Sequence, residues 1–268
     1  MGNVVDQAEG LRRLMLFSRA RTIALVAGTR GAGATRCVIN LARALSGKGR
    51  RVLVVDENVS NQSVAKLLGM SARYDLKHVI GGDCELEQAL LHGPDGICVL
   101  PAARAAHALP RLDSYSEQRA IACFAHLDRT ADIVLLDARS DAYEPTPFAT
   151  AVQEVIVVVS PGPSSIKGGY TVLKRMSRSH GRRRFHILVN RSRDDGAADR
   201  VFGNMAQAAT RHLDLTLNFM GAIPHDAELN ASAEAALSCR TATTRSFSKH
   251  AETVLRWSAQ HDAVSRLD

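Results

Sequence analysis

Short apolar runs alternate along this chain with segments in which apolar residues recur every three or four positions. The apolar runs lie at 22–27, 51–55, 97–100, 132–137, 155–159, 186–189 and 215–220. The periodic segments predict helices near 35–45 and at 62–68, 117–128, 166–177 and 201–213. Continuous apolar runs are typical of strands that are buried on both faces of a parallel sheet. We therefore expect an α/β fold, a doubly wound and mostly parallel sheet flanked by helices, in one domain.

Turn residues mark the expected connections between these elements. Residues 47–49 (GKG) end the first helix, and a second cluster of turn residues lies at 81–83. We expect 145–150 and 194–199 to be flexible loops, and 221–224 (GAIP) to be a turn that follows the last strand. Neither an internal repeat nor a low-complexity linker divides the chain.

Amphipathic segments lie at both ends of this domain. Residues 6–17 place apolar side chains on one helical face, which predicts a short helix that lies on its own domain or docks with a partner. Residues 247–267 predict a second amphipathic helix, for which packing on the domain is favoured over a membrane surface. The expected organisation is an N-terminal docking helix at 1–20, a central domain at 21–245 and the C-terminal amphipathic helix at 246–268.

Composition is that of an ordinary soluble domain. Of the 268 residues, 46% are hydrophobic and 23% are charged. No apolar run is long enough for a membrane span, and the N-terminus does not resemble a signal peptide. We expect a cytoplasmic protein, with peripheral contact to the inner membrane as the alternative.

The charge balance leaves several classes of partner open. Lys and Arg number 34 against 27 for Asp and Glu, which gives a net charge of +7. This excess suits nucleic acid, anionic lipid or an acidic protein surface. Aromatic residues make up only 4% of the chain, which argues against a groove that stacks bases. The five cysteines lack metal-ligand spacing, so neither a zinc site nor a disulfide framework is indicated.

A glycine-rich turn joins the first apolar run to the first helix. Residues 28–35 read GTRGAGAT and fit the phosphate-binding pattern G-x-x-x-x-G-K-[ST], except that Ala34 replaces the lysine. In such a loop the backbone N–H groups surround the β-phosphate, and the hydroxyl, here that of Thr35, binds Mg²⁺. The residues expected to hold a nucleotide here are Gly28, Thr29, Arg30, Gly31, Ala32, Gly33, Ala34, Thr35 and Arg36.

Polar residues at the ends of later strands extend this site. Asp56 and Asp137 each end an apolar strand, so both are expected to hold Mg²⁺ through water; the alternative is that they only begin turns. Asn190 ends another strand and is expected to hydrogen-bond an adenine edge, with turn chemistry as its alternative. The cofactors that such a site would take are ATP or ADP together with Mg²⁺.

Together these motifs resemble the MinD/ParA family of P-loop ATPases with a deviant Walker A loop, and within it the FlhG- and FleN-like regulators of flagellum number and placement. The segments that carry the resemblance are DQAEGLRRL (6–14), GTRGAGAT (28–35), VVDEN (54–58), DIVLLDA (132–138), the strand end at Asn190 and GAIPHD (221–226). They cover nearly the whole chain. The resemblance implies a MinD-like P-loop NTPase domain at 21–245, ATP binding, and a nucleotide contact by Pro224.

The same resemblance implies partners. In that family a D-Q-A-x-x-L-R segment engages and stimulates a signal-recognition-type GTPase, FlhF, which assigns this contact to Asp6, Gln7, Ala8, Leu11 and Arg12. Further partners that the resemblance implies are a flagellar transcriptional regulator, motor switch proteins, a peripheral membrane contact and a second copy of the chain in a homodimer.

Departures from the family pattern bear on catalysis. Thr29 stands where the family has the lysine that reaches across an ATP-bound dimer, and Ala34 stands where it has the P-loop lysine. Asn58 stands where the family has the acidic residue that positions the attacking water. Asn can orient a water molecule but cannot accept its proton, and loss of one positioned cation slows phosphoryl transfer by about 10³-fold. We therefore predict a regulator with weak or absent ATP hydrolysis, in which Asn58 and Asp137 are the candidate catalytic residues that remain.

Two other functions stay open at this point. The first is an active MinD-like ATPase that cycles on and off the membrane. In it Arg30 or Arg36 would replace the lysine, although a guanidinium is not geometrically equivalent to an ammonium. The second is a ParA-like DNA-associated protein, which the +7 charge and the arginine cluster at 175–184 suit. The alternative for that cluster is a solvated helix end.

Overall fold

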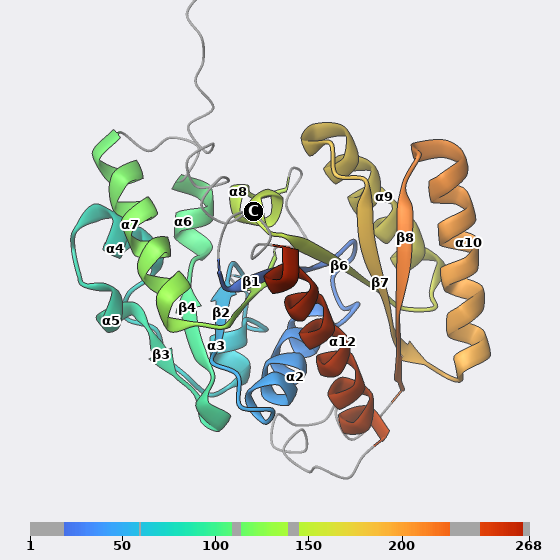
Figure 1. Cartoon of the computed structure of the whole chain (residues 1–268), viewed down its shortest axis with the longest axis horizontal. Helices are drawn as coiled ribbons and strands as arrows, with labels where there is room; N and C mark the ends of the chain where they lie inside the picture. Colours follow the sequence, from blue (N-terminus) through green and yellow to red (C-terminus); the bar gives the residue numbers. More distant parts are fainter. Residues whose placement is uncertain (1–18, 59, 109–113, 139–144, 226–241, 265–268) are drawn as a thin grey trace, which may run out of the picture.

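The computed structural model describes residues 19–58, 60–108, 114–138, 145–225 and 242–264 of the chain (Figure 1). Eight strands in these ranges form one sheet. They are β1 (Arg21–Ala27), β2 (Val52–Asp56), β3 (Leu91–His92), β4 (Cys98–Pro101), β5 (Ile133–Asp137), β6 (Glu154–Val159), β7 (Arg184–Ser192) and β8 (Thr216–Pro224). Their order is β3-β4-β2-β5-β1-β6-β7-β8, and every pair is parallel except β3 with β4. The predicted doubly wound, mostly parallel sheet is confirmed.

Helices cover both faces of this sheet. They are α2 (Ala34–Ser46), α3 (Val64–Leu67), α4 (Leu76–Gly81), α5 (Leu86–Ala89), the 3₁₀ turn η1 (Pro94–Gly96), α6 (Ala103–Ala108), α7 (Ser114–Thr130), α8 (Pro147–Ala151), α9 (Pro163–His180), α10 (Asp195–Leu213) and α12 (Ala242–Val264). Figure 1 shows α2 and α12 together in front of the sheet, and their apolar side chains share one core. Apolar residues of α4 to α10 form the core on the other face.

The central strand β1 shows why the strands appear in the sequence as continuous apolar runs. Ile23 and Leu25 belong to the core that contains α2, whereas Ala24 and Val26 belong to the core on the opposite face. All four side chains are buried. Because helices pack on both faces of the sheet at β1, neither of its faces meets water, and the strand has no exposed face on which polar residues would alternate with apolar ones.

Two segments predicted to be flexible loops, 145–150 and 194–199, contain helices, so that prediction is wrong. Most of the first segment forms α8, in which Pro147 occupies the first turn and Phe148 is fully buried. The second contains the start of α10, whose N-cap Asp194 accepts a hydrogen bond from the backbone. Pro and Asp favour turns, but they also favour helix starts, and tertiary packing decides between the two.

The two edges of the sheet also differ from the prediction. The turn expected at 221–224 is the last part of β8, where Gly221 has a φ of +131° and lies against His250 of α12. At the other edge, the sequence pattern predicts neither the antiparallel strand β3 nor the helix α6 that follows β4. Elements of so few residues do not show a periodic pattern of apolar positions in the sequence.

The C-terminal amphipathic helix packs on its own domain, which is the favoured alternative. Phe247 and Val254 of α12 are buried in the core shared with α2. The Trp257 ring packs against the His186 ring of β7, with ring centroids 3.9 Å apart and ring planes tilted by 31°. None of the helices in the described ranges combines the length and the hydrophobicity that a bilayer span requires.

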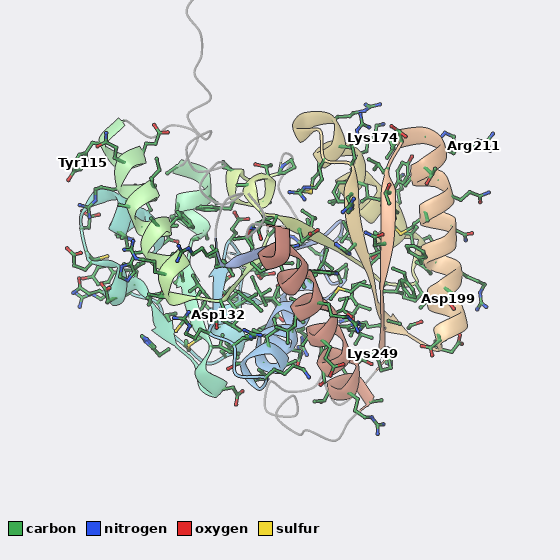
Figure 2. The ribbon with its side chains drawn as sticks, viewed as in Figure 1. Tyr115, Asp132, Lys174, Asp199, Arg211 and Lys249 are labelled. Carbon is green, nitrogen blue, oxygen red and sulfur yellow. The ribbon has the colours of Figure 1, made fainter. Side chains whose placement is uncertain are left out.

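The arginine cluster near the end of α9 contains two kinds of side chain. Arg182 is half-buried, and its guanidinium donates hydrogen bonds to backbone carbonyls beside the start of β6. Arg183 and Arg184 are exposed. Figure 2 shows Lys174 of α9 and Arg211 of α10 at the same end of the molecule. This end is basic; Arg178 is exposed like Arg183 and Arg184, whereas Arg175 is half-buried like Arg182.

A contact between two glycines positions the turn that follows β1. A Cβ atom on Gly168 of α9 would lie 2.6 Å from the carbonyl oxygen of Gly28, which is closer than real Cβ atoms approach a backbone oxygen. The start of the glycine-rich turn therefore rests on the backbone of α9. A side chain at either position would push the turn away from the helix.

We predict that Gly168→Ala lowers the free energy of unfolding by about 1–3 kcal/mol, because the added methyl group overpacks this contact. Gly203→Ala in α10 is the matched control, since a Cβ at that exposed position meets no atom within 4 Å. The control should raise the free energy of unfolding by about 0.5–1 kcal/mol. Urea titration measures both values, and equal stability of the two variants would contradict the contact.

Candidate functional site

The carboxyl ends of several strands meet beside the N-terminus of α2 and enclose a cavity of about 650 Å³. In open α/β sheets this edge is where ligands bind. Residues of β1, β5 and β7 and of the segments that follow β1, β2, β5 and β8 contribute to its wall. The cavity is lined by Ala27, Thr29, Arg30, Gly31, Gly33, Ala34, Thr35, Arg36, Asn58, Ser60, Gln62, Leu67, Asp137, Ala138, Arg191 and His225.

The glycine-rich turn supplies backbone N–H groups to this cavity. Gly31 and Gly33 have φ values of +82° and +94°, a conformation that strains other residues. Gly33 is the N-cap of α2, and this helix has neither a side-chain cap nor an acidic residue in its first turn. A helix N-terminus without a capping side chain offers its N–H groups and partial positive charge to an anion. The turn is therefore suited to phosphate.

None of the described residues that line the cavity is a lysine. Ala34 is 8% exposed, and its methyl group belongs to the core that contains α2. Among the described residues, the guanidinium groups that line the cavity belong to Arg30, Arg36 and Arg191. The turn keeps the backbone part of a phosphate site and lacks the point charge that the P-loop lysine provides.

Thr35 and Asp137 meet at the floor of the phosphate turn. The Thr35 hydroxyl donates a hydrogen bond to Asp137 Oδ2 at 2.9 Å, and Asn58 Nδ2 donates to Thr35 Oγ1 at 3.3 Å. A hydroxyl and a carboxylate are oxygen ligands of the kind that Mg²⁺ prefers, and Mg²⁺ usually takes its other ligands from phosphates and water. In the described part of the chain no three His, Cys, Asp or Glu side chains are grouped to hold a metal by themselves. The residues therefore fit a metal that arrives with phosphate.

Asp56 lies outside the cavity wall. Its side chain is 3% exposed and accepts hydrogen bonds from the backbone N–H groups of Asn58 at 3.0 Å and Ala65 at 3.2 Å. These bonds order the segment between β2 and α3. Burial raises the pKa of Asp56 to about 6, although the backbone hydrogen bonds act in the opposite direction. The structure thus gives Asp56 a backbone-organising position, and its predicted role as a metal ligand stays a prediction.

Asp137 is buried among like charges. Its side chain is 1% exposed, and burial first, then the charges of Asp56 and Glu57, raise its pKa well above the usual value. Glu57 is fully buried on the far side of this strand end, where the Thr146 hydroxyl donates to its carboxylate at 2.6 Å. Several carboxylates thus lie within a small volume, an arrangement that favours a proton or a cation on Asp137.

Asn190 supports the glycine-rich turn through hydrogen bonds to the backbone. Its Nδ2 donates to the carbonyl of Ala32 at 2.8 Å, and its Oδ1 accepts from the N–H of Arg191 at 3.0 Å. Neither Asn190 nor Pro224 lines the cavity; His225, the next residue along, does. In this structure Asn190 braces the loop, and its predicted contact with an adenine edge stays a prediction.

The predicted nucleotide residues fall into two groups. Those that line the cavity are Thr29, Arg30, Gly31, Gly33, Ala34, Thr35 and Arg36; those that do not are Gly28, Ala32, Asn190 and Pro224. Sequence reasoning missed Arg191, His225, Ser60 and Gln62, which the cavity includes. The signal that could have found them is their position, since Arg191 is the penultimate residue of β7 and the other three lie within a few residues after a strand end.

We predict that Asp137→Asn, which removes the charge and keeps the size, gains stability relative to the parent protein as the pH rises from about 4 towards 8. A raised folded-state pKa means that folding favours the protonated acid, so the ionised carboxylate destabilises the fold above the usual carboxyl pKa of about 4. The advantage of the variant should disappear below that pH. Urea titrations across this range measure the difference.

Asp132→Asn is the control, for which the pH dependence of stability should have the opposite sign. Asp132, labelled in Figure 2, accepts hydrogen bonds from the Arg51 guanidinium, which lower its pKa. This variant should lose stability relative to the parent as the pH rises through the same range. A pH-independent difference for Asp137→Asn would contradict the buried charge.

Comparison with known proteins places this site in a family. A family model described as the CobQ/CobB/MinD/ParA nucleotide binding domain matches residues 23–238. Antiactivator FleN of Pseudomonas aeruginosa is 33% identical over 207 residues, which cover 77% of this chain and 74% of that protein. The flagellum site-determining protein YlxH of Helicobacter pylori is 21% identical over 215 residues, which cover 77% and 70%.

The solved structures agree on the fold. The septum site-determining protein MinD of Pyrococcus horikoshii, complexed with Mg-ADP, superposes with a TM-score of 0.61 at 22% identity, covering 88% of this chain and 96% of that one. At this identity the likeness shows the fold alone. The family model, in contrast, spans most of the chain and includes the glycine-rich turn, Asp56, Asp137 and Asn190. This chain belongs to the CobQ/CobB/MinD/ParA family of nucleotide-binding domains.

Proposed function

We propose that this protein is a regulator of flagellum number and placement that binds a magnesium nucleotide and hydrolyses it very slowly or not at all. One observation carries the proposal: the phosphate turn, the open helix N-terminus and the Thr35–Asp137 pair are intact, while Ala34 occupies the lysine position. The names of FleN and YlxH support the flagellar part. The family description and the Mg-ADP complex of MinD support the nucleotide.

Several groups that would bind a magnesium nucleotide are present in this site. Backbone N–H groups at the start of α2 would hold phosphate oxygens, and each charge-assisted hydrogen bond contributes about 1.5–3 kcal/mol. Thr35 and Asp137 are the residues that would hold Mg²⁺, which neutralises phosphate charge when it is bound. The missing lysine weakens this set without removing it. Affinity should therefore be reduced and measurable.

Two kinds of group that would promote nucleotide hydrolysis, an ammonium group and a carboxylate, are replaced at the matching positions. Ala34 and Thr29 leave no ammonium group to stabilise the charge that develops during phosphoryl transfer, a loss of about 10³-fold for a single cation. Asn58 stands where the family places an acidic residue, and its Nδ2 donates to Thr35 Oγ1 and to the Gln62 carbonyl. An amide in this position orients a water molecule but takes no proton from it.

We predict that Ala34→Lys increases the affinity for Mg-ADP by about 10- to 100-fold, because it restores a charged contact worth about 1.5–3 kcal/mol. Ala34→Met, which has similar length and no charge, is the matched control and should not increase the affinity. Ala34 is buried and borders the cavity, so both longer side chains displace the same core neighbours, and the two variants differ in charge. Titration calorimetry measures the three proteins, and equal gains for Lys and Met would contradict a missing charge.

The partner contact rests on the N-terminal segment. The predicted docking residues Asp6, Gln7, Ala8, Leu11 and Arg12 lie outside the described residues. We propose that they dock a signal-recognition-type flagellar GTPase, on the strength of their match to the family segment. Because this segment precedes β1, the contact does not require the catalytic positions that have changed.

We predict that the double substitution Asp6→Ala and Gln7→Ala reduces binding of this GTPase at least about 10-fold, as expected for two central polar contacts of a small interface. Glu9→Ala, in the same segment and outside the matched positions, is the control and should bind as the parent does. Surface-immobilised GTPase and purified full-length chain give the affinities. Undiminished binding by the double variant would exclude this docking segment.

A further inference from the structure

Arg191 has a backbone conformation that its side chain does not favour. Three non-glycine residues in the described ranges have positive φ, namely Asp95, Arg191 and Asp214, and the value at Arg191 is +57°. Asp tolerates this left-handed conformation because its short side chain hydrogen-bonds the nearby backbone. Arg has no such local compensation. Strained conformations of this kind are concentrated at binding sites, where the surrounding structure enforces them.

A bulge in the sheet places Arg191. In the pairing of β7 with β8, Val189 lies opposite Ala222 and Ser192 lies opposite Pro224, with a register shift between them. Two residues of β7 therefore occupy the space of one residue of β8. Bulges of this kind redirect side chains and are common beside active sites. Here the bulge turns two successive side chains, Asn190 and Arg191, towards the phosphate turn.

Both side chains contact carbonyls of that turn. Asn190 donates to Ala32 O, and Arg191 Nη1 donates to Gly31 O at 3.0 Å. Arg191 also lines the cavity, whereas Asn190 does not. The guanidinium therefore lies over the turn whose N–H groups face the same cavity.

We propose that Arg191 supplies the cationic phosphate contact that Ala34 cannot, and that its guanidinium binds the phosphates of a nucleoside diphosphate or triphosphate. This inference rests on the proposed nucleotide binding and names the residue that replaces the missing charge. A guanidinium is planar, permanently charged and able to donate two parallel hydrogen bonds to phosphate oxygens. The bond to Gly31 holds the group at the turn.

Arg30 and Arg36, the replacements considered from the sequence, also line the cavity. Arg191 is the stronger assignment for two reasons that concern its backbone. It stands at a bulge that redirects its side chain, and it keeps a left-handed conformation that glycine would adopt without strain. A side chain whose backbone has a strained conformation is expected to contribute to a binding site, because such conformations are concentrated there.

The test compares full-length proteins that carry Arg191→Gly, Arg191→Ala and Arg191→Lys, with Arg193→Ala as control. Arg193 is exposed and does not line the cavity. Titration calorimetry with Mg-ADP at low and high NaCl concentrations gives the affinity and its salt dependence. Thermal unfolding gives the stability, and the glycine variant should unfold at a higher temperature than the alanine variant because glycine accepts the positive φ.

We expect the glycine and alanine variants to bind Mg-ADP about 10- to 100-fold more weakly than the parent protein, with a smaller dependence on salt. The lysine variant should keep part of the affinity and of the salt dependence, because it keeps the charge and loses the planar donors. The control should match the parent.

Three results would overturn the assignment, and they differ from one another. Unchanged affinity in Arg191→Gly would reject Arg191 and leave nucleotide binding in place. Reduced affinity with unchanged salt dependence would show that Arg191 only braces the Gly31 carbonyl. Absence of Mg-ADP binding by the parent protein would reject the proposed function itself.

Discussion

The hydrogen bond from Thr35 to Asp137 joins the phosphate turn to the centre of the sheet, and the rest of the site is arranged around it. Asp137 ends β5, which lies between β1 and β2, and Thr35 stands in the first turn of α2. The bond therefore fixes the helix N-terminus against the end of β5. It also gives a buried carboxylate a polar partner, without which its burial would be strongly unfavourable. The proposed binding of phosphate and metal depends on this arrangement, which is present although Ala34 stands at the lysine position.

The parts of the structure that the sequence predicts are those that burial determines locally. Strands buried on both faces appear as continuous apolar runs, and a residue at a strand end, such as Asp137, is placed by that strand. Prediction fails where placement depends on pairing between distant segments. The bulge in β7 turns Asn190 to the loop backbone and Arg191 to the cavity, and no periodicity in the sequence reports it. Phe148 likewise sits in a segment rich in turn residues, and only tertiary packing makes it helical.

Binding and hydrolysis make different demands on such a site, and the proposed function, binding without rapid hydrolysis, depends on this difference. Binding uses many contacts, most of them from backbone N–H groups that any sequence with the right glycines retains. Hydrolysis depends on a few charges placed where charge develops in the transition state. The altered positions Thr29, Ala34 and Asn58 belong to the second group. A protein of this kind can respond to nucleotide as a ligand while it regulates through its partners.

The measurement that tests this account most directly is a single-turnover experiment with the full-length protein in excess over radiolabelled ATP and Mg²⁺. Filter retention reports the bound nucleotide, and chromatography of the quenched samples reports its conversion. The account predicts that ATP is retained by the protein and remains ATP over many times the turnover time of an intact family ATPase. Conversion to ADP at a rate typical of intact family members would contradict it, and so would the absence of any bound nucleotide.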